Sequence, residues 1–207
     1  MWALVEDNAI VKIINNPKAM VIGDTRHSRK IFELWSAEEL EAIGIYEIVF
    51  DNSNKKDEEY YINTNQSFDY ADGVATASYG SATAKELDDR NEVDEAGEPL
   101  LDDKGNQIVT KGLKTLKKKD IKKQASSLLE PTDWYNHKAL DDATFTIPAN
   151  ITTYRASVRT KSNEMETAID NASDVDALAT LYEYVNTGTE ENPVMERPLG
   201  EFPTLEI

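Results

Sequence analysis

The chain of 207 residues contains no cysteine and only two histidines, His27 and His137. Without cysteine it can form neither a disulfide scaffold nor a thiolate zinc site, and it has no thiol nucleophile. Neither histidine belongs to a motif that places it beside a serine or a carboxylate, so we interpret both as loop or surface residues. Side chains that commonly serve nucleophilic or metal catalysis are therefore scarce.

Phosphate-binding glycine motifs and long apolar runs are also missing. The chain has no Gly-x-x-x-x-Gly-Lys loop and no Gly-x-Gly-x-x-Gly pattern after a strand, so the sequence contains no recognisable nucleotide-binding site. No window approaches the roughly eighteen apolar residues of a membrane-spanning helix, and the first residues lack the basic start and long apolar centre of a signal peptide. We therefore expect no membrane insertion, no cofactor and no small-molecule substrate.

Basic residues are greatly outnumbered. The 22 lysines and arginines face 39 acidic residues, which gives a formal net charge of −17. Positive charge is concentrated between Lys111 and Lys123, where seven lysines accompany one aspartate and no aromatic residue. Nucleic acids bind to positive surfaces, and single strands also stack on aromatic side chains, so we expect no nucleic-acid partner.

Residues 1–84 have the pattern of a β-rich N-terminal domain. Two β-branched runs, residues 2–6 and 10–14, flank Asp7 and Asn8, which tolerate the backbone angles of tight turns. The sequence therefore predicts a hairpin at the start of the chain.

Three further local signals follow within this domain. Asp72-Gly73 joins two alternating segments and is a strong hairpin signal. Ser36 and Glu39 have the spacing of a capping box, which predicts a short helix that Gly44 ends. The alternating residues directly after Gly44 predict another strand.

Residues 85–110 form an acidic arm or linker. Between Glu86 and Asn106, nine acids accompany one arginine and one lysine, and apolar residues are few. Turn-like sequences around Gly97 and Gly105 favour a solvent-exposed hairpin, with disorder as the alternative. The acids do not have the spacing of a calcium-binding loop, so we expect no metal site.

Residues 111–186 predict a small C-terminal helical unit. A first amphipathic helix starts near Lys111 and ends before Pro131, with Leu116 on its apolar face. The apolar residues of a second helix recur at helical spacing: Ile151, Tyr154, Val158, Met165 and Ile169. A third begins at Ser173, three residues before Asp176. Residues 187–207 form an extended tail, either a docking strand or a flexible end. The fold class expected is α+β.

Six residues are candidates for contact with a partner. The basic side chains of the first helix either complement the chain's own acidic helices, bind an acidic partner subunit or simply face solvent. A second basic cluster lies between β-like runs, and an aromatic residue opens the N-terminal hairpin. The candidates are Trp2, Arg26, Arg29, Lys117, Lys118 and Lys122.

A helix corner carries the most specific pattern of the chain. Leu128-Leu129-Glu130-Pro131-Thr132-Asp133-Trp134 ends the first helix, and Tyr154-Arg155-Ala156-Ser157-Val158-Arg159 lies in the second. The Trp134 ring is suited to cover the core while its indole N–H meets a local carbonyl. The two arginines are one helical turn apart and could pair with Asp133 or later acids. We interpret these residues as a structural anchor first and a binding site second.

This corner resembles one found in bacteriophage tail-fibre assembly proteins and related tail-associated structural proteins of the marine phage type. In that family a Leu-Leu-x-x-Thr/Ser-Asp-Trp corner precedes a helix with Tyr-Arg-x-x-Val/Leu-Arg. The opening Met1-Trp2-Ala3-Leu4-Val5-Glu6-Asp7 and the segment Gly44-Ile45-Tyr46 also resemble the family's N-terminal hairpin and its Gly-Ile/Val-Tyr motif. The chain departs from the pattern in Asn8-Ala9, where the family often has Asn-Gly, and in its acidic arm and lysine-rich helix.

The resemblance implies a non-enzymatic component of a phage virion tail, assembled in the host cytoplasm. Such a protein would act as an adaptor or tail-fibre-associated subunit, docking on phage tail or fibre proteins in several copies of a symmetric assembly. The alternative is a tail-fibre assembly chaperone that binds the fibre tip and does not stay in the virion.

Overall fold

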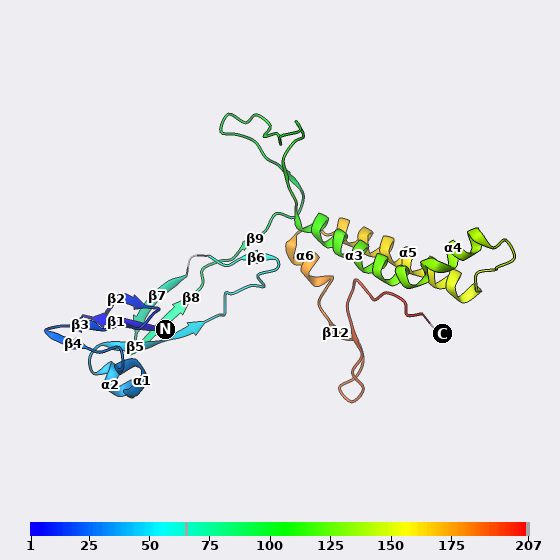
Figure 1. Cartoon of the computed structure of the whole chain (residues 1–207). Helices are drawn as coiled ribbons and strands as arrows, with labels where there is room; N and C mark the ends of the chain where they lie inside the picture. Colours follow the sequence, from blue (N-terminus) through cyan, green and yellow to red (C-terminus); the bar gives the residue numbers. More distant parts are fainter. Residues whose placement is uncertain (65, 206–207) are drawn as a thin grey trace. The chain divides into compact units, whose positions relative to one another are not determined.

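The computed structural model describes residues 1–64 and 66–205. The chain divides into two compact units, Met1–Ala84 and Lys85–Ile207. The first is built around a β-sheet, and the second contains the long helices (Figure 1). The expected α+β class, with a β-rich N-terminal part and a helical C-terminal part, is therefore confirmed.

The first unit is organised around a curled five-stranded sheet with the order β2-β1-β5-β8-β7. All neighbours are antiparallel except β5 and β8, which are parallel. The edge strands β2 and β7 also approach each other, which accounts for the curl (Figure 1). The strands are β1 (Trp2–Glu6), β2 (Ala9–Ile14), β5 (Ile45–Asp51), β7 (Ser67–Ala71) and β8 (Val74–Ser78).

Both predicted hairpins are present, and their turn residues have the required backbone angles. Asp7 and Asn8, which join β1 to β2, have φ of 49° and 62°. Asp72 and Gly73, which join β7 to β8, have φ of 51° and 81°. Positive φ at both central residues gives the turn a twist that matches the strands, so local turn chemistry sets these two registers.

The two faces of the sheet bury different clusters. On one face Leu4, Ile14 and Ile45 pack with Ile31 of α1 (Ile31–Leu34) and Leu40 of α2 (Ala37–Glu41). On the other face a second cluster forms around small and aromatic residues: Ala3, Ile48, Ala75 and Ala77 with Tyr46, Phe68 and Tyr70. Neighbouring residues such as Ala3 and Leu4 face opposite sides, as strand geometry requires.

The predicted capping box begins α2. The Ser36 side chain accepts from the Glu39 amide, and the Glu39 carboxylate accepts from the Ser36 amide. Gly44 follows the helix with φ of 81°, and its carbonyl accepts from the Val5 amide at 2.8 Å. This glycine therefore joins the end of α2 to the central strands.

Short two-stranded ladders complete the first unit. The hairpin of β3 and β4 places Val21 opposite Arg26, and Met20 opposite His27. The strands β6 and β9 are also antiparallel, with Tyr61 opposite Ala84 and Ile62 opposite Thr83. The bounds are β3 (Met20–Ile22), β4 (Thr25–His27), β6 (Tyr61–Ile62) and β9 (Thr83–Ala84).

The second unit contains two long helices, α3 and α5, that pack side by side (Figure 1). A 3-10 turn and a short helix connect them, and another short helix follows. The bounds are α3 (Leu113–Leu129), η1 (Glu130–Thr132), α4 (Asp133–Asp141), α5 (Ala149–Asp170) and α6 (Val175–Thr180).

The C-terminal segment belongs to the core of this unit. β12 (Val185–Asn186) and β13 (Met195–Glu196) form a hairpin. Beyond it, Leu199 is buried, and Phe202 and Leu205 pack against the cluster of Ala125, Tyr154 and Val158 from α3 and α5. Of the two alternatives for the tail, docking is therefore observed, and its target is the chain's own helices.

Two details of the helices differ from the sequence prediction. Leu116 is 45% exposed, whereas the buried row of α3 includes Lys117, which is 7% exposed. The Lys117 ammonium lies 4.3 Å from the centre of the Tyr182 ring, an interaction that offsets the burial of its charge. The N-cap of α6 is Asp174, whose carboxylate accepts from the Ala177 amide, and not Ser173.

Candidate docking surfaces

Arg155 is the centre of the helix corner. It is 7% exposed, and its guanidinium donates to the Leu129 carbonyl at 2.9 Å, to the Thr132 hydroxyl and to the Asp133 carboxylate at 2.7 Å. A planar guanidinium can reach all three acceptors because its donors point along a fork. It thereby holds the end of α3, the η1 turn and the start of α4 against α5.

The other corner residues divide into buried and exposed ones. Tyr154 is buried and donates its hydroxyl to the Leu128 carbonyl at 3.2 Å. Arg159 is exposed and donates to the Arg155 carbonyl at 3.4 Å. Trp134 is 50% exposed, so it does not cover the core as expected. Arg155 anchors the corner, and Trp134 is turned toward solvent.

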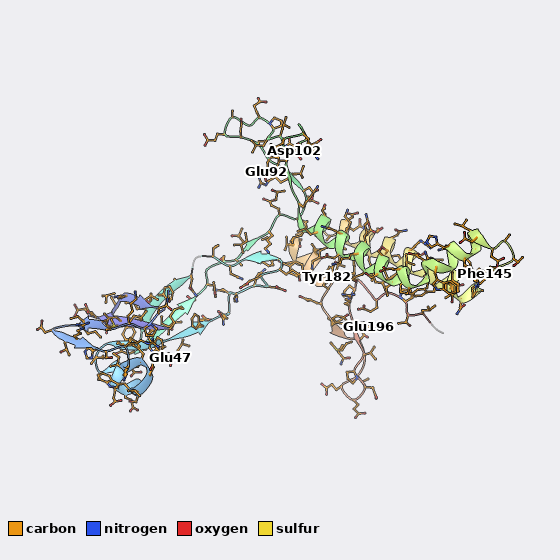
Figure 2. The ribbon with its side chains drawn as sticks, in the orientation of Figure 1. Glu47, Glu92, Asp102, Phe145, Tyr182 and Glu196 are labelled. Carbon is orange, nitrogen blue, oxygen red and sulfur yellow. The ribbon has the colours of Figure 1, made fainter. Side chains whose placement is uncertain are left out.

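The exposed tryptophan belongs to an aromatic cluster formed by α4 and the segment that follows it. Its ring stacks on Tyr135 with 3.8 Å between centroids, and Phe145 lies 6.4 Å from Trp134 and 6.3 Å from Tyr135. The Lys138 ammonium covers the Phe145 ring at 4.4 Å. None of the residues of α4 is buried, and Leu140 is 84% exposed. Figure 2 shows Phe145 in this part of the helical unit. We call Trp134, Tyr135, Leu140 and Phe145 the aromatic tip.

The lysine-rich helix is paired mainly with the chain's own acids. Lys118 lies 2.6 Å from the Asp170 carboxylate, and Lys122 lies 3.1 Å from that of Glu166, both on α5. Lys117 is buried, so it is not a partner-binding residue. Of the alternatives left by the sequence, complementarity between α3 and the acidic C-terminal part of α5 accounts for these contacts.

The N-terminal candidates also have different surroundings. Trp2 is partly buried and contacts Phe32 edge-on, with 5.1 Å between centroids, so it belongs to the core and not to a docking surface. Arg26 is exposed on the β3–β4 hairpin. Arg29 is exposed but pairs with Glu33 at 2.9 Å. Lys30, which precedes α1, is exposed.

The acidic arm folds as two successive turns of the same form. The Asp94 carboxylate accepts from the amides of Ala96 and Glu98. Eight residues later, the Asp102 carboxylate accepts in the same way from the amides of Lys104 and Asn106. Each aspartate is followed three residues later by a glycine, Gly97 or Gly105, with φ of 85° and 81° respectively. The arm therefore contains an eight-residue repeat, which the sequence analysis missed although Asp-x-x-Gly recurs at that spacing.

The repeat closes on itself through backbone hydrogen bonds. Three backbone bonds of 2.8–2.9 Å form a ring. The Leu100 amide donates to the Glu92 carbonyl, the Ile108 amide donates to the Leu100 carbonyl, and the Glu92 amide donates to the Ile108 carbonyl. The Gln107 side-chain amide donates to the same three carbonyls at 2.6–3.1 Å. At its base the arm is closed by β10 (Arg90–Asn91) and β11 (Val109–Thr110). Of the two alternatives for this segment, a hairpin-like fold is thus observed. Figure 2 labels Glu92 and Asp102 within it, and we call residues 90–110 the octad arm.

The arm is joined to α3 through the start of that helix. The amides of Leu113 and Lys114 donate to the carbonyls of Glu86 and Leu87, and the Gly112 amide donates to the Asp89 carboxylate at 3.0 Å. These acceptors satisfy amides that have no partner within the helix. The Asp89 carboxylate also accepts from the Lys111 ammonium at 2.8 Å.

The Asp89 carboxyl group should titrate with a pKa of about 2. Hydrogen bonds from Lys111, from the Gly112 amide and from Thr115 lower this pKa from its ordinary value of 3.8. Because the pKa is lower in the folded chain, the stabilisation is complete above about pH 4 and is lost as the pH falls toward 2. Carboxyl NMR titration measures the pKa directly, and Lys111→Met should raise it. A pKa near 3.8 in the parent chain would contradict the assignment.

We searched the residues that the structure describes for side chains grouped as in a catalytic or metal-binding site. A shallow groove along α5 contains two carboxylates, but Glu201 pairs with Arg197 at 2.8 Å and Glu164 lies 3.8 Å from Lys161. Each carboxylate is thus next to a basic group, whereas glycoside hydrolysis, a reaction that two carboxyl groups can carry out, needs the pair to face each other across a sugar. Over residues 1–64 and 66–205, no three His, Cys, Asp or Glu residues are grouped so that they could hold a metal ion.

Within the same two stretches, none of the helices has the length and apolar character needed to span a bilayer.

No protein-family model matches the chain, and neither a curated protein nor a solved structure matches it. Function must therefore be inferred from the residues and surfaces of the chain itself.

Proposed function

We propose that this chain is a non-enzymatic structural subunit of a bacteriophage tail, an adaptor or fibre-associated protein that acts by docking on other tail proteins. The aromatic tip carries this proposal. Trp134 and Tyr135 lie on α4, which has no buried residue of its own and also exposes Leu140, and Phe145 follows four residues after the end of that helix. Exposed tryptophan and tyrosine side chains are typical anchors of protein–protein contacts, because they bury a large area with few rotatable bonds.

The tip is also held in place before any partner binds. Asp133 and Thr132, directly before Trp134, are hydrogen-bonded to the buried Arg155. A surface held in one conformation loses less entropy on binding than a mobile one. The resemblance of the corner to those of phage tail-fibre assembly proteins supports a tail or fibre protein as the partner.

The proposal can be tested in particles of a phage that encodes this chain. Quantitative mass spectrometry of purified virions should detect it, and Trp134→Ser with Leu140→Ser should reduce the incorporated amount at least about tenfold, as expected for loss of interface anchors. Leu116→Ser removes a similarly exposed apolar side chain from α3 and serves as the control.

The two functional alternatives give different results in this experiment. Absence of the parent chain from infectious virions, together with its presence on unassembled fibres, would replace the adaptor with the assembly chaperone. Equal incorporation of the double variant would exclude the aromatic tip as the docking surface. Circular dichroism of the purified variants should match that of the parent, because both replaced side chains are exposed.

A further inference from the structure

The octad arm exposes apolar side chains that its own unit leaves uncovered. Val93 is 49% exposed, Leu100 40%, Leu101 55% and Ile108 41%. These side chains occupy the first two positions of the eight-residue repeat, so the fold of the arm gathers them within one small element. Four large apolar side chains at such exposure are typical of a contact surface.

The charges beside this surface are acidic and partly unpaired. Asp94 and Asp102 are used within the turns, and Glu92 pairs with Arg90 at 3.0 Å. The carboxylates of Glu95, Glu98 and Asp103 have no basic group within 4.0 Å among the described residues. A molecule that covers the arm should therefore combine apolar side chains with positive charge.

The N-terminal unit carries a surface of that composition. The β3–β4 hairpin and α1 expose Val21 (61%), Leu34 (73%) and Trp35 (38%), and the Trp35 ring meets that of His27 edge-on. In the same segment, Arg26 and Lys30 are exposed and lie more than 4.0 Å from every carboxylate that the structure describes. Val21 and Arg26 are cross-strand neighbours and share one face of the hairpin, whereas His27, which Trp35 contacts, faces the other side. We call Val21, Arg26, Lys30 and Leu34 the basic patch.

The lysines of α3 are weaker candidates for the same role. Lys118 and Lys122 already pair with α5, and Lys117 is buried beneath Tyr182. Their charges are compensated within the chain, and Leu116 is the one large apolar side chain beside them that α3 exposes. The basic patch offers two exposed apolar side chains, Val21 and Leu34, together with uncompensated charge.

We propose that the octad arm of one copy docks on the basic patch of a second copy. Each chain has one arm and one patch, so two copies can exchange arms about a two-fold axis, or copies can link head to tail. Head-to-tail contacts build rings where the rotation closes and linear assemblies where it does not. The inference rests on the proposed docking function and names a second copy of this chain as one partner.

Charge reversal on each surface provides the test, with sedimentation velocity of the full chain at low salt as the measurement. The parent chain should self-associate as its concentration rises, and less so at high salt, where ion pairs are screened. Arg26→Glu with Lys30→Glu should raise the dissociation constant at least about tenfold, because the patch would then repel the arm. Glu95→Lys with Asp103→Lys should have the same effect.

An equimolar mixture of the two reversed variants gives the decisive result. The native arm of the first variant faces the native patch of the second, and the reversed patch of the first faces the reversed arm of the second. Association should therefore return in the mixture although neither variant associates alone. Lys119→Glu with Lys123→Glu changes the net charge as much as the patch reversal, on exposed residues of α3, and should associate like the parent.

Three results would overturn the contact: a parent chain that stays monomeric at every concentration, a mixture that does not associate, or a control pair that weakens association as much as the patch reversal. A monomeric parent would leave the virion experiment unaffected, since incorporation through the aromatic tip does not depend on the arm. Failure of the self-contact and failure of the proposed tail function are thus distinguishable.

Discussion

Replacing Arg155 with methionine is expected to destabilise the helical unit by about 2–4 kcal/mol. Methionine fills much of the same space but donates no hydrogen bond. The Leu129 carbonyl and the Thr132 hydroxyl, which both accept from Arg155, would lose a charged donor at a buried position. The Thr132 hydroxyl would still donate to the Leu129 carbonyl at 2.7 Å, so most of the expected cost comes from the lost charge-assisted hydrogen bonds of the guanidinium.

The effect should be concentrated at the corner. Amide hydrogen exchange of residues 130–141 should accelerate more than that of the middle of α3, because Arg155 joins η1 and α4 to α5. The aromatic tip would lose its fixed position, so the same variant should also weaken incorporation into virions.

Two further variants separate charge from geometry. Arg155→Lys keeps the positive charge but has one ammonium in place of a planar fork, so it should recover part of the stability and not all of it. Asp133→Asn should cost less than about 1 kcal/mol, because the Asp133 side chain is 50% exposed and its ion pair is screened by water. If Asp133→Asn cost as much as Arg155→Met, the ion pair and not the buried hydrogen bonds would hold the corner.

The features that the sequence predicted best depend on residues close together in the chain. The capping box of Ser36 and Glu39 spans four residues, and the turns at Asp7-Asn8 and Asp72-Gly73 span two each. In each case the side chains or backbone angles of these residues supply the stabilising interaction themselves. Packing elsewhere in the protein did not overrule them.

The helix surfaces were harder to predict because tertiary packing sets which face is buried. Spacing of apolar residues placed Leu116 inside, but the buried row of α3 passes through Leu113, Lys117 and Ile121. A lysine can occupy this row because its methylene stem is apolar and Tyr182 receives its ammonium. The aromatic ring comes from a residue far along the chain, so the local pattern contained no sign of it.

The candidate docking residues show the same limit. Trp134 was expected to cover the core, but the guanidinium of Arg155 already fills the corner, and the indole stacks on Tyr135 at the surface. The octad arm is the opposite case, since its signal was local. Asp94 and Asp102 each precede a glycine by three residues, and recognition of that recurrence would have favoured an ordered arm over disorder.

Gly44→Ala is expected to have the largest effect on the β-rich unit, a loss of roughly 3 kcal/mol or more. An alanine at φ of 81° costs about 1–2 kcal/mol, because its side chain crowds the backbone in the left-handed region. A Cβ atom at this position would also lie 2.7 Å from the Val5 carbonyl oxygen, which belongs to the backbone of β1 and cannot rotate away. Displacing it would strain the hydrogen bond from the Val5 amide to the Gly44 carbonyl.

Gly73→Ala separates these two contributions. Gly73 also has a φ of 81°, but a Cβ atom there would meet nothing within 4 Å, so its cost should be that of the backbone angle alone, about 1–2 kcal/mol. The loss of stability in each variant can be measured from the amide hydrogen exchange rates of β1 and β5. The exchange rates of α3 and α5 should not change, because the helical unit has its own core. Equal losses in the two variants would mean that β1 moves away from the new methyl group without cost, and the close approach of Gly44 to Val5 would then contribute nothing to the stability of the sheet.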